Sequence, residues 1–265
     1  MIELNRIYNE DCLEGMKRIP DGSVDLVLTD PPYGTTVCKW DSVIPFEPMW
    51  EQIHRVAKRN AAIILFGSEP FSSYLRVSNV ANYKYDIYWK KEKPTNFFQL
   101  KNRIGKSTEC ISLFYKEQPT YKPIMIKHSG SKVTNKPKGV HKSIVAGNSK
   151  QRVTPYIDSG YRYPCDVLEI RREKLGTTVH PTQKPVALLE YLIRTYSNEG
   201  ETVLDFTMGS GSTGVACINT NRNFIGFELD KHYCDIANER IQKALAEAED
   251  SDWISDYDTR RKEEL

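Results

Sequence analysis

Short apolar runs alternate with amphipathic stretches along most of this chain. The apolar runs have the length of buried strands, and the amphipathic stretches carry apolar residues at the spacing of one helix face. We expect strands at residues 6–8, 24–29, 61–66, 83–89, 110–115, 203–206 and 224–227, and helices at residues 12–18, 48–58, 70–77, 185–196, 215–219 and 233–247. This alternation predicts an α/β fold.

Residues 118–157 lack this patterning. The segment is rich in turn-forming residues and contains no aspartate or glutamate, but it has eight lysines or arginines. These are Lys122, Lys127, Lys132, Lys136, Lys138, Lys142, Lys150 and Arg152. So long a segment without an acid favours contact with nucleic-acid phosphates. We therefore interpret it as an inserted lobe or loop outside the sheet, with these residues as candidate DNA ligands.

The bulk composition narrows the class of protein. The net charge is only +2. The end of the chain, residues 247–265, holds eight acids and three bases. This composition predicts an acidic surface tail at residues 248–265. No apolar run reaches the length of a membrane span, and the N-terminus lacks a signal-peptide pattern. The six cysteines are scattered without a C-x-x-C pair, so we expect reduced thiols, no bound metal and a cytoplasmic location.

The strongest chemical signal is the tetrapeptide Asp30-Pro31-Pro32-Tyr33 at the end of the apolar run 24–29. The two prolines end the strand and remove two backbone donors, which leaves carbonyl oxygens free at its tip. A carboxylate, free carbonyls and an aromatic ring together suit a planar amine that is held by two acceptors and stacked on the ring. A nucleobase with an exocyclic amino group fits this description.

A second signal lies far downstream, where the apolar run 203–206 leads into a glycine-rich turn and a helix. The turn, residues 209–214, has the sequence Gly-Ser-Gly-Ser-Thr-Gly, which allows a nucleotide-like ligand to approach the backbone closely. Glu228 ends the following strand and is placed to accept both hydroxyls of a ribose. Because this turn also satisfies the dinucleotide fingerprint, a dehydrogenase is an alternative interpretation.

These motifs resemble those of the S-adenosylmethionine-dependent DNA amino-methyltransferases. Two further segments share the resemblance, residues 9–12 (Asn-Glu-Asp-Cys) and residues 180–185 (His-Pro-Thr-Gln-Lys-Pro). The order, with the amine-binding motif before the cofactor motif, resembles the permuted β-group of the family, and the resemblance covers residues 1–117 and roughly 176–245.

The resemblance implies a Rossmann-like methyltransferase fold, with a mostly parallel seven-stranded sheet and helices on both faces. It implies a catalytic domain formed by residues 1–117 and 176–247, with an inserted target-recognition region at residues 118–175. The region between the two blocks reads DNA sequence in this family. That region contains the basic segment identified above from charge alone.

For catalysis, the resemblance implies roles for Asp30, Pro31, Pro32 and Tyr33. The Asp30 carboxylate and the Pro31 carbonyl would accept the two N–H bonds of an adenine amino group, freeing its lone pair to attack a methyl group in line. Tyr33 would stack on the target base. The base must leave the duplex to reach such a pocket, so base flipping is expected.

For the cofactor, S-adenosylmethionine, the resemblance assigns a larger set of residues. Glu228 would hold the ribose, Asp11 and Cys12 the adenine, Thr182 and Lys184 the methionine carboxylate, and Asp205 would orient the turn and the methionine amino group. The full set of expected cofactor residues is Asp11, Cys12, Asp30, Thr182, Lys184, Asp205, Phe206, Gly209, Ser210, Gly211, Ser212 and Glu228.

Other functions remain open at this stage. An aspartate at the first position of the tetrapeptide is more typical of adenine-N6 members of the family than of cytosine-N4 members, but cytosine-N4 methylation is an alternative. A second is methylation of RNA or of a protein amide, and a third is a DNA-binding regulator that has lost catalysis. Candidate partners beside duplex DNA are a second copy of the chain and a restriction endonuclease acting on the same site. We interpret Cys165, which follows Pro164, as a packing residue and not as a nucleophile.

Overall fold

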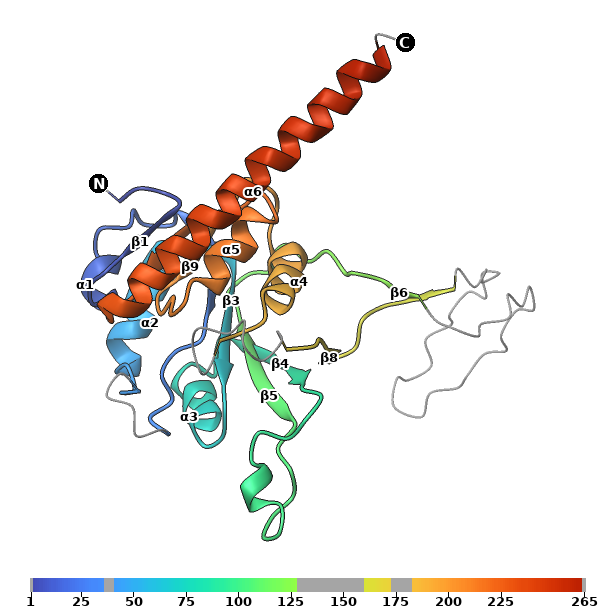
Figure 1. Cartoon of the computed structure of the whole chain (residues 1–265). Coiled ribbons are helices and arrows are strands. Elements are labelled where there is room, and N and C mark those ends of the chain that lie inside the picture. Colours follow the sequence, from blue (N-terminus) through green and yellow to red (C-terminus); the bar gives the residue numbers. More distant parts are fainter. Residues whose placement is uncertain (1, 36–40, 128–159, 173–182, 264–265) are drawn as a thin grey trace, which may run out of the picture. The chain divides into compact units, whose positions relative to one another are not determined.

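The computed structural model describes residues 2–35, 41–127, 160–172 and 183–263. The chain forms two compact units, one made of Met1–Lys122 and Asp166–Leu265 and the other of Pro123–Cys165. The larger unit is built on a sheet with helices on both faces (Figure 1). The expected α/β fold is confirmed.

The sheet has the strand order β1-β10-β9-β2-β3-β5-β4-β8. The strands are β1 (Arg6–Tyr8), β2 (Val24–Thr29), β3 (Ala57–Gly67), β4 (Tyr83–Lys90), β5 (Thr108–Phe114), β8 (Val167–Glu169), β9 (Thr202–Asp205) and β10 (Asn223–Phe227). All neighbouring pairs are parallel except those of β5, which runs antiparallel to both β3 and β4. The sheet is therefore mostly parallel, as expected.

Helices cover both faces because successive side chains of a strand point to opposite sides. In β2, Leu26 and Leu28 pack with one buried cluster, whereas Val27 between them packs with the other. The first cluster includes residues of α4 (Val186–Tyr196), α5 (Ser212–Ile218) and α6 (Lys231–Glu263). The second includes residues of α1 (Cys12–Met16), α2 (Phe46–Val56) and α3 (Phe71–Ser78). A sheet buried on both faces explains why its central strands are continuous apolar runs.

The topology places a binding site at one point of the sheet. β2 lies next to β9, and the chain continues from β2 to β3 on one side and from β9 to β10 on the other. The strand order therefore reverses between β2 and β9. In open parallel sheets, ligands bind outside the carboxyl ends of the strands at such a point. The tetrapeptide follows β2 and the glycine turn follows β9, so both predicted motifs lie there.

The structure corrects several expected boundaries. The sheet has eight strands and not seven, because β8 pairs with β4. β8 comes from the region 118–175 that was expected to be the insertion, and the smaller unit is only Pro123–Cys165. Helix α6 continues to Glu263, through residues that were expected to form a tail. Among the described residues, no helix has the length and hydropathy needed to cross a membrane.

The described part of the smaller unit contains a short antiparallel pair, β6 (Ile126–Lys127) and β7 (Tyr161–Arg162). Its exposed apolar side chains include Ile126 and Tyr163. Of the predicted DNA-binding residues, Lys122 and Lys127 are described, and both are exposed. The other six, Lys132, Lys136, Lys138, Lys142, Lys150 and Arg152, lie outside the described residues.

Candidate functional site

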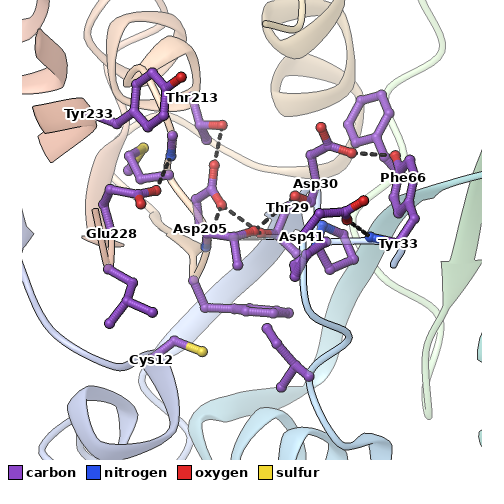
Figure 2. Close-up of a pocket in the computed structure, with 18 of the residues that line it drawn as sticks. Cys12, Thr29, Asp30, Tyr33, Asp41, Phe66, Asp205, Thr213, Glu228 and Tyr233 are labelled. Carbon is purple, nitrogen blue, oxygen red and sulfur yellow. Dashed lines mark hydrogen bonds between the residues drawn. The ribbon is translucent and has the colours of Figure 1, made fainter. Parts of the chain in front are cut away.

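A cavity of about 420 Å³ opens at the carboxyl ends of β2 and β9 (Figure 2). Its lining includes the tetrapeptide from Asp30 to Tyr33, the turn after β9, and Glu228 at the end of β10. Asp30 and Gly209 are far apart in the sequence, yet both line this one cavity. The tetrapeptide and the glycine turn therefore face a shared space.

The tetrapeptide is held by hydrogen bonds to its backbone. The Asp41 carboxylate accepts from the backbone N–H groups of Tyr33 (2.7 Å), Gly34 (2.8 Å) and Thr35 (2.8 Å). The Asp30 carbonyl accepts from the Thr207 hydroxyl at 3.1 Å. The expectation that the carbonyls at the strand tip are free is thus wrong for Asp30, whose carbonyl ties β2 to the turn after β9.

The Asp30 carboxylate belongs to a buried network of four charges. One oxygen accepts from the Tyr33 hydroxyl and the other from the Lys184 ammonium. The Lys184 Nζ also lies 2.8 Å from Glu109 Oε1, and the second Glu109 oxygen is paired with Lys91. Two carboxylates and two ammonium groups balance each other here, which offsets the cost of burying charge.

The pKa values of this network are set by burial and by its own charges. Burial raises the pKa of the Asp30 carboxyl, and this effect outweighs the opposing effect of the Lys184 ammonium. Burial also acts on Glu109, but there Lys184 and Lys91 outweigh it and lower the pKa to about 2. Burial lowers the pKa of Lys184, but Asp30 and Glu109 outweigh it and the net shift is upward. Glu109 and Lys184 are therefore charged at neutral pH, and Asp30 is the acid of this network that takes up a proton more readily.

Access to the Asp30 carboxylate is retained despite this burial. Its side chain keeps 23% of its surface exposed, compared with 7% for Lys184 and 10% for Glu109. Burial, reinforced by the charge of Asp30, raises the pKa of Tyr33, so its hydroxyl stays protonated and donates. The Tyr33 ring also packs against Phe71, with the ring centroids 5.1 Å apart. Asp30 is thus the acid in this network that a ligand in the cavity can reach.

The turn after β9 is organised around Asp205. Its carboxylate accepts from the hydroxyls of Thr29 and Thr213, both at 2.5 Å, and from the Thr207 N–H at 3.1 Å (Figure 2). Burial raises its pKa to about 6, against the lowering by these hydrogen bonds. Since Thr29 is the last residue of β2, Asp205 fixes the turn to the end of β2. This agrees with the expectation that it orients the turn.

Two glycines of the turn have different reasons to be glycine. Gly209 has a φ of 53° and open space where a Cβ would lie, whereas at Gly211 (φ of 81°) a Cβ would come within 2.9 Å of the Ala237 Cα. Gly211 is also missing from the described residues that line the cavity. Its role is close packing of the turn on α6, which differs from the cofactor contact expected from the sequence.

The lining of the cavity also includes Glu228 and the first residues of α1. Glu228 accepts from the Gly209 N–H at 2.7 Å and from the Asp230 N–H at 2.8 Å, and burial raises its pKa. Asp11 caps α1 by accepting from the N–H groups of Leu13 and Glu14, and it lines the cavity together with Cys12. These acids therefore also hold the backbone in place around the cavity.

Most predicted site residues meet in this cavity. Those that line it are Asp11, Cys12, Asp30, Pro31, Pro32, Tyr33, Lys184, Asp205, Phe206, Gly209, Ser210, Ser212 and Glu228. Thr182 lies outside the described residues. Lys184 is at the cavity as expected, but its ammonium is bound to Asp30 and Glu109, on the side of the tetrapeptide.

Sequence reasoning missed several residues of this site. Glu109 near the start of β5 and Lys91 after β4 complete the charge network, and Asp41 anchors the tetrapeptide. Phe66, near the end of β3, places its ring 5.1 Å from the Lys184 Nζ. The one available signal was the acid at the beginning of the apolar strand at Glu109, where a charge is unusual unless it is paired.

Comparison with known proteins agrees with this geometry. Residues 24–239 match the N6/N4-type family model described as "DNA methylase". "DNA adenine methyltransferase YhdJ" of Escherichia coli (strain K12) is 28% identical over 257 residues, covering 91% of this chain and 84% of that protein.

Two solved structures are similar to this chain in fold. The M1.HpyAVI–SAM complex has a TM-score of 0.58 at 27% identity and covers 89% of this chain and 98% of its own. "PVUII DNA METHYLTRANSFERASE (CYTOSINE-N4-SPECIFIC)" shares the fold, with a TM-score of 0.62 at 16% identity over 91% of each chain. The family match spans most of the chain and includes both motifs that line the cavity, so this chain belongs to the N6/N4 DNA methylase family.

Proposed function

We propose that this protein transfers a methyl group from S-adenosylmethionine to the N6 amino group of an adenine that is flipped out of duplex DNA. The observation that carries this proposal is the shared cavity, in which an accessible carboxylate at the tip of β2 faces the glycine turn after β9. The cofactor carries its methyl group on a sulfonium, so this methyl group is already a good electrophile. The protein has to supply alignment and the placement of charge.

The cavity has the features that such a cofactor requires. Glu228 follows β10, the strand next to β9, and is proposed to accept the ribose hydroxyls. Asp11 and Cys12 at the start of α1 are proposed to border the adenine, and the turn beginning at Gly209 to border the methionine part. The proposal is supported by a relative of similar length, M1.HpyAVI, whose structure is a complex with SAM.

Asp30 is the proposed catalytic acceptor. An adenine amino group is a poor nucleophile because its lone pair is delocalised into the ring. Hydrogen bonds from its two N–H groups to the Asp30 carboxylate and the Pro31 carbonyl favour a tetrahedral nitrogen and free the lone pair. Orientation of this kind accounts for roughly 7–11 kcal/mol of a barrier.

Asp30 is also the proposed acceptor of the proton that the amine must lose. Burial raises its pKa, so its carboxylate is a stronger base than an exposed one. Lys184 holds one of its oxygens and keeps it charged before the reaction. In the structure the other oxygen accepts from Tyr33, so the incoming amine shares or replaces this hydrogen bond.

Duplex DNA is the proposed substrate because of the family match and the basic segment of the chain. The smaller unit and the basic segment around it, residues 118–175, are the proposed target-recognition region. Adenine is favoured over cytosine by Asp30 at the first position of the tetrapeptide and by the adenine-methylating relative YhdJ. Base flipping is proposed because the Asp30 carboxylate lies inside a cavity that a stacked base cannot reach.

The test is incorporation of labelled methyl from S-adenosylmethionine into unmethylated genomic DNA, followed by nucleoside analysis. The proposal predicts N6-methyladenine. Recovery of N4-methylcytosine would leave DNA amino-methylation intact and overturn the choice of base. Absence of any labelled nucleoside, with the cofactor bound, would favour a regulator that has lost catalysis.

A further inference from the structure

The loop that joins β4 to β5, residues 91–107 (the β4–β5 loop), begins and ends beside the catalytic network. Lys90 pairs with Thr108, and Cys110 of β5 pairs with Gly67 at the end of β3. The loop therefore leaves the sheet at the same edge as the end of β3, the edge on which the cavity opens. Its first residue, Lys91, is paired with Glu109. In Figure 1 the loop extends away from the sheet and carries the short helix η1 (Phe97–Gln99).

The loop has a defined internal structure. Thr95 N–H donates to the Lys106 carbonyl at 2.9 Å, and the Lys106 N–H donates to the Asn96 side chain at 2.6 Å. A Cβ on Gly105 would lie 2.9 Å from Leu100 and 3.0 Å from Pro94, so the loop packs closely on itself. Hydrogen bonds within the loop therefore form a frame that holds its backbone, and with it the positions of its side chains, in place.

Large apolar side chains stand on the outside of this frame. Phe98 is 89% exposed and Ile104 is 92% exposed. Phe97 is also exposed, and its ring centroid lies 4.2 Å from that of Phe98. Apolar groups this exposed contribute little to folding, and a cluster of them marks a contact surface.

The charge of the loop favours an anionic partner. The loop, residues 91–107, contains five lysines or arginines and one acid, Glu92. Lys101 and Arg103, which lie between Phe98 and Ile104 in the sequence, are exposed, and among the described residues neither takes part in an ion pair. Positive side chains around aromatic and aliphatic ones are suited to a polyanion with stacked bases.

We propose that the β4–β5 loop is a DNA contact separate from the recognition region, and that Phe98, supported by Ile104, enters the duplex where the target base has left it. This inference rests on the proposed function. An extruded base leaves a gap in the stack, and filling that gap with an apolar side chain stabilises the open duplex. Lys101 and Arg103 contact the neighbouring phosphates.

The test uses the full-length protein with Phe98→Ala and Ile104→Ala combined. The matched control is Val80→Ala, because Val80 is 70% exposed and precedes the amino end of β4, at the opposite edge of the sheet. Phe98→Trp keeps a ring that can stack. The readouts are methyl transfer to duplex genomic DNA, affinity for a duplex by fluorescence anisotropy, affinity for S-adenosylmethionine, and the thermal midpoint.

The double variant is expected to lose about tenfold or more in duplex methylation and to bind the duplex more weakly, since one stacked base contributes on this scale. Cofactor affinity and thermal midpoint stay at the wild-type values, Val80→Ala behaves as wild type, and Phe98→Trp retains most of the activity. In a duplex with 2-aminopurine at the mapped target position, the double variant gives a smaller fluorescence rise.

Wild-type duplex affinity and methylation in the double variant would overturn the proposal. A double variant that elutes as a monomer on size exclusion, where the wild type elutes as a dimer, would also overturn it, because Phe98 and Ile104 would then belong to a subunit contact. A wild-type protein that transfers no methyl group refutes the proposed function. The duplex affinity of the double variant then decides on the loop separately.

Discussion

The two sides of the cavity use carboxylates in opposite ways. On the side proposed for catalysis (the catalytic side), Asp30 and Glu109 are balanced by Lys184 and Lys91. On the side proposed for the cofactor (the cofactor side), Asp205 and Glu228 accept hydrogen bonds from hydroxyls and backbone N–H groups. One pair of acids is paired with charges, and the other pair organises neutral groups.

This difference indicates that the two sides have different requirements for their acids. An acid that must hold an amine and take its proton needs a set charge, and opposite charges set it most strongly. An acid that shapes a turn needs only donors, and its pKa then rises with burial, to about 6 for Asp205. Substitutions on the catalytic side should therefore alter turnover and its pH dependence, whereas those on the cofactor side should alter cofactor binding and stability.

The largest effect is expected for Asp30→Ala. Loss of the acceptor should lower methyl transfer by about 1,000-fold or more. The affinity for S-adenosylmethionine, measured by calorimetry, should change little because the cofactor is assigned to the other side of the cavity. Substantial turnover in this variant would remove Asp30 from the mechanism.

Lys184→Met and Glu109→Gln should shift the pH profile in opposite directions. Removing the ammonium raises the pKa of Asp30, so the acidic limb of kcat/KM moves to higher pH and activity falls about 100-fold. Removing the Glu109 charge lowers the pKa of Asp30, so the same limb moves to lower pH. Shifts of the same sign in both variants would contradict the charge network.

Gly211→Ala and Gly209→Ala form a matched pair on the cofactor side. Both positions have positive φ, which costs an alanine about 1–2 kcal/mol. Only at Gly211 would the new Cβ also meet the Ala237 backbone, so this variant should lose further stability in urea unfolding. Equal losses in the two variants would show that the turn does not pack on α6 as described.

The Asp205 carboxyl should make the stability of the protein depend on pH. Its pKa is raised to about 6 in the folded protein. Its contribution to stability is thus fully present below pH ~4 and is lost as pH rises through about 6, by up to about 3 kcal/mol. The free energy of unfolding of wild type relative to Asp205→Asn should therefore fall between pH 4 and 7. A difference that is constant with pH would contradict the raised pKa.

Much of this molecule could be predicted because its signals are local. The apolar runs at β2 and β9 identify the central strands, and the motifs that follow them identify the cavity, since both strands end at one edge of the sheet. The short strand β8 has only three residues and gains its stability from pairing with β4, so no local pattern marks it.

The charge network could not be predicted for a similar reason. Lys184 was expected to bind the cofactor's carboxylate, but the partner of a buried ammonium depends on which acids the fold brings to it. Glu109 is distant from Asp30 in the sequence, and the antiparallel strand β5 brings it to the same lysine, Lys184. Lys91, which follows β4, joins the network through Glu109.

A structure of the protein bound to S-adenosylmethionine tests the central claim most directly. We predict that the sulfonium methyl faces the Asp30 carboxylate across a gap that one amino group can fill, with Glu228 at the ribose and Lys184 still paired with Asp30. A methyl group turned away from Asp30, with Lys184 bound to the cofactor's carboxylate, would contradict the account.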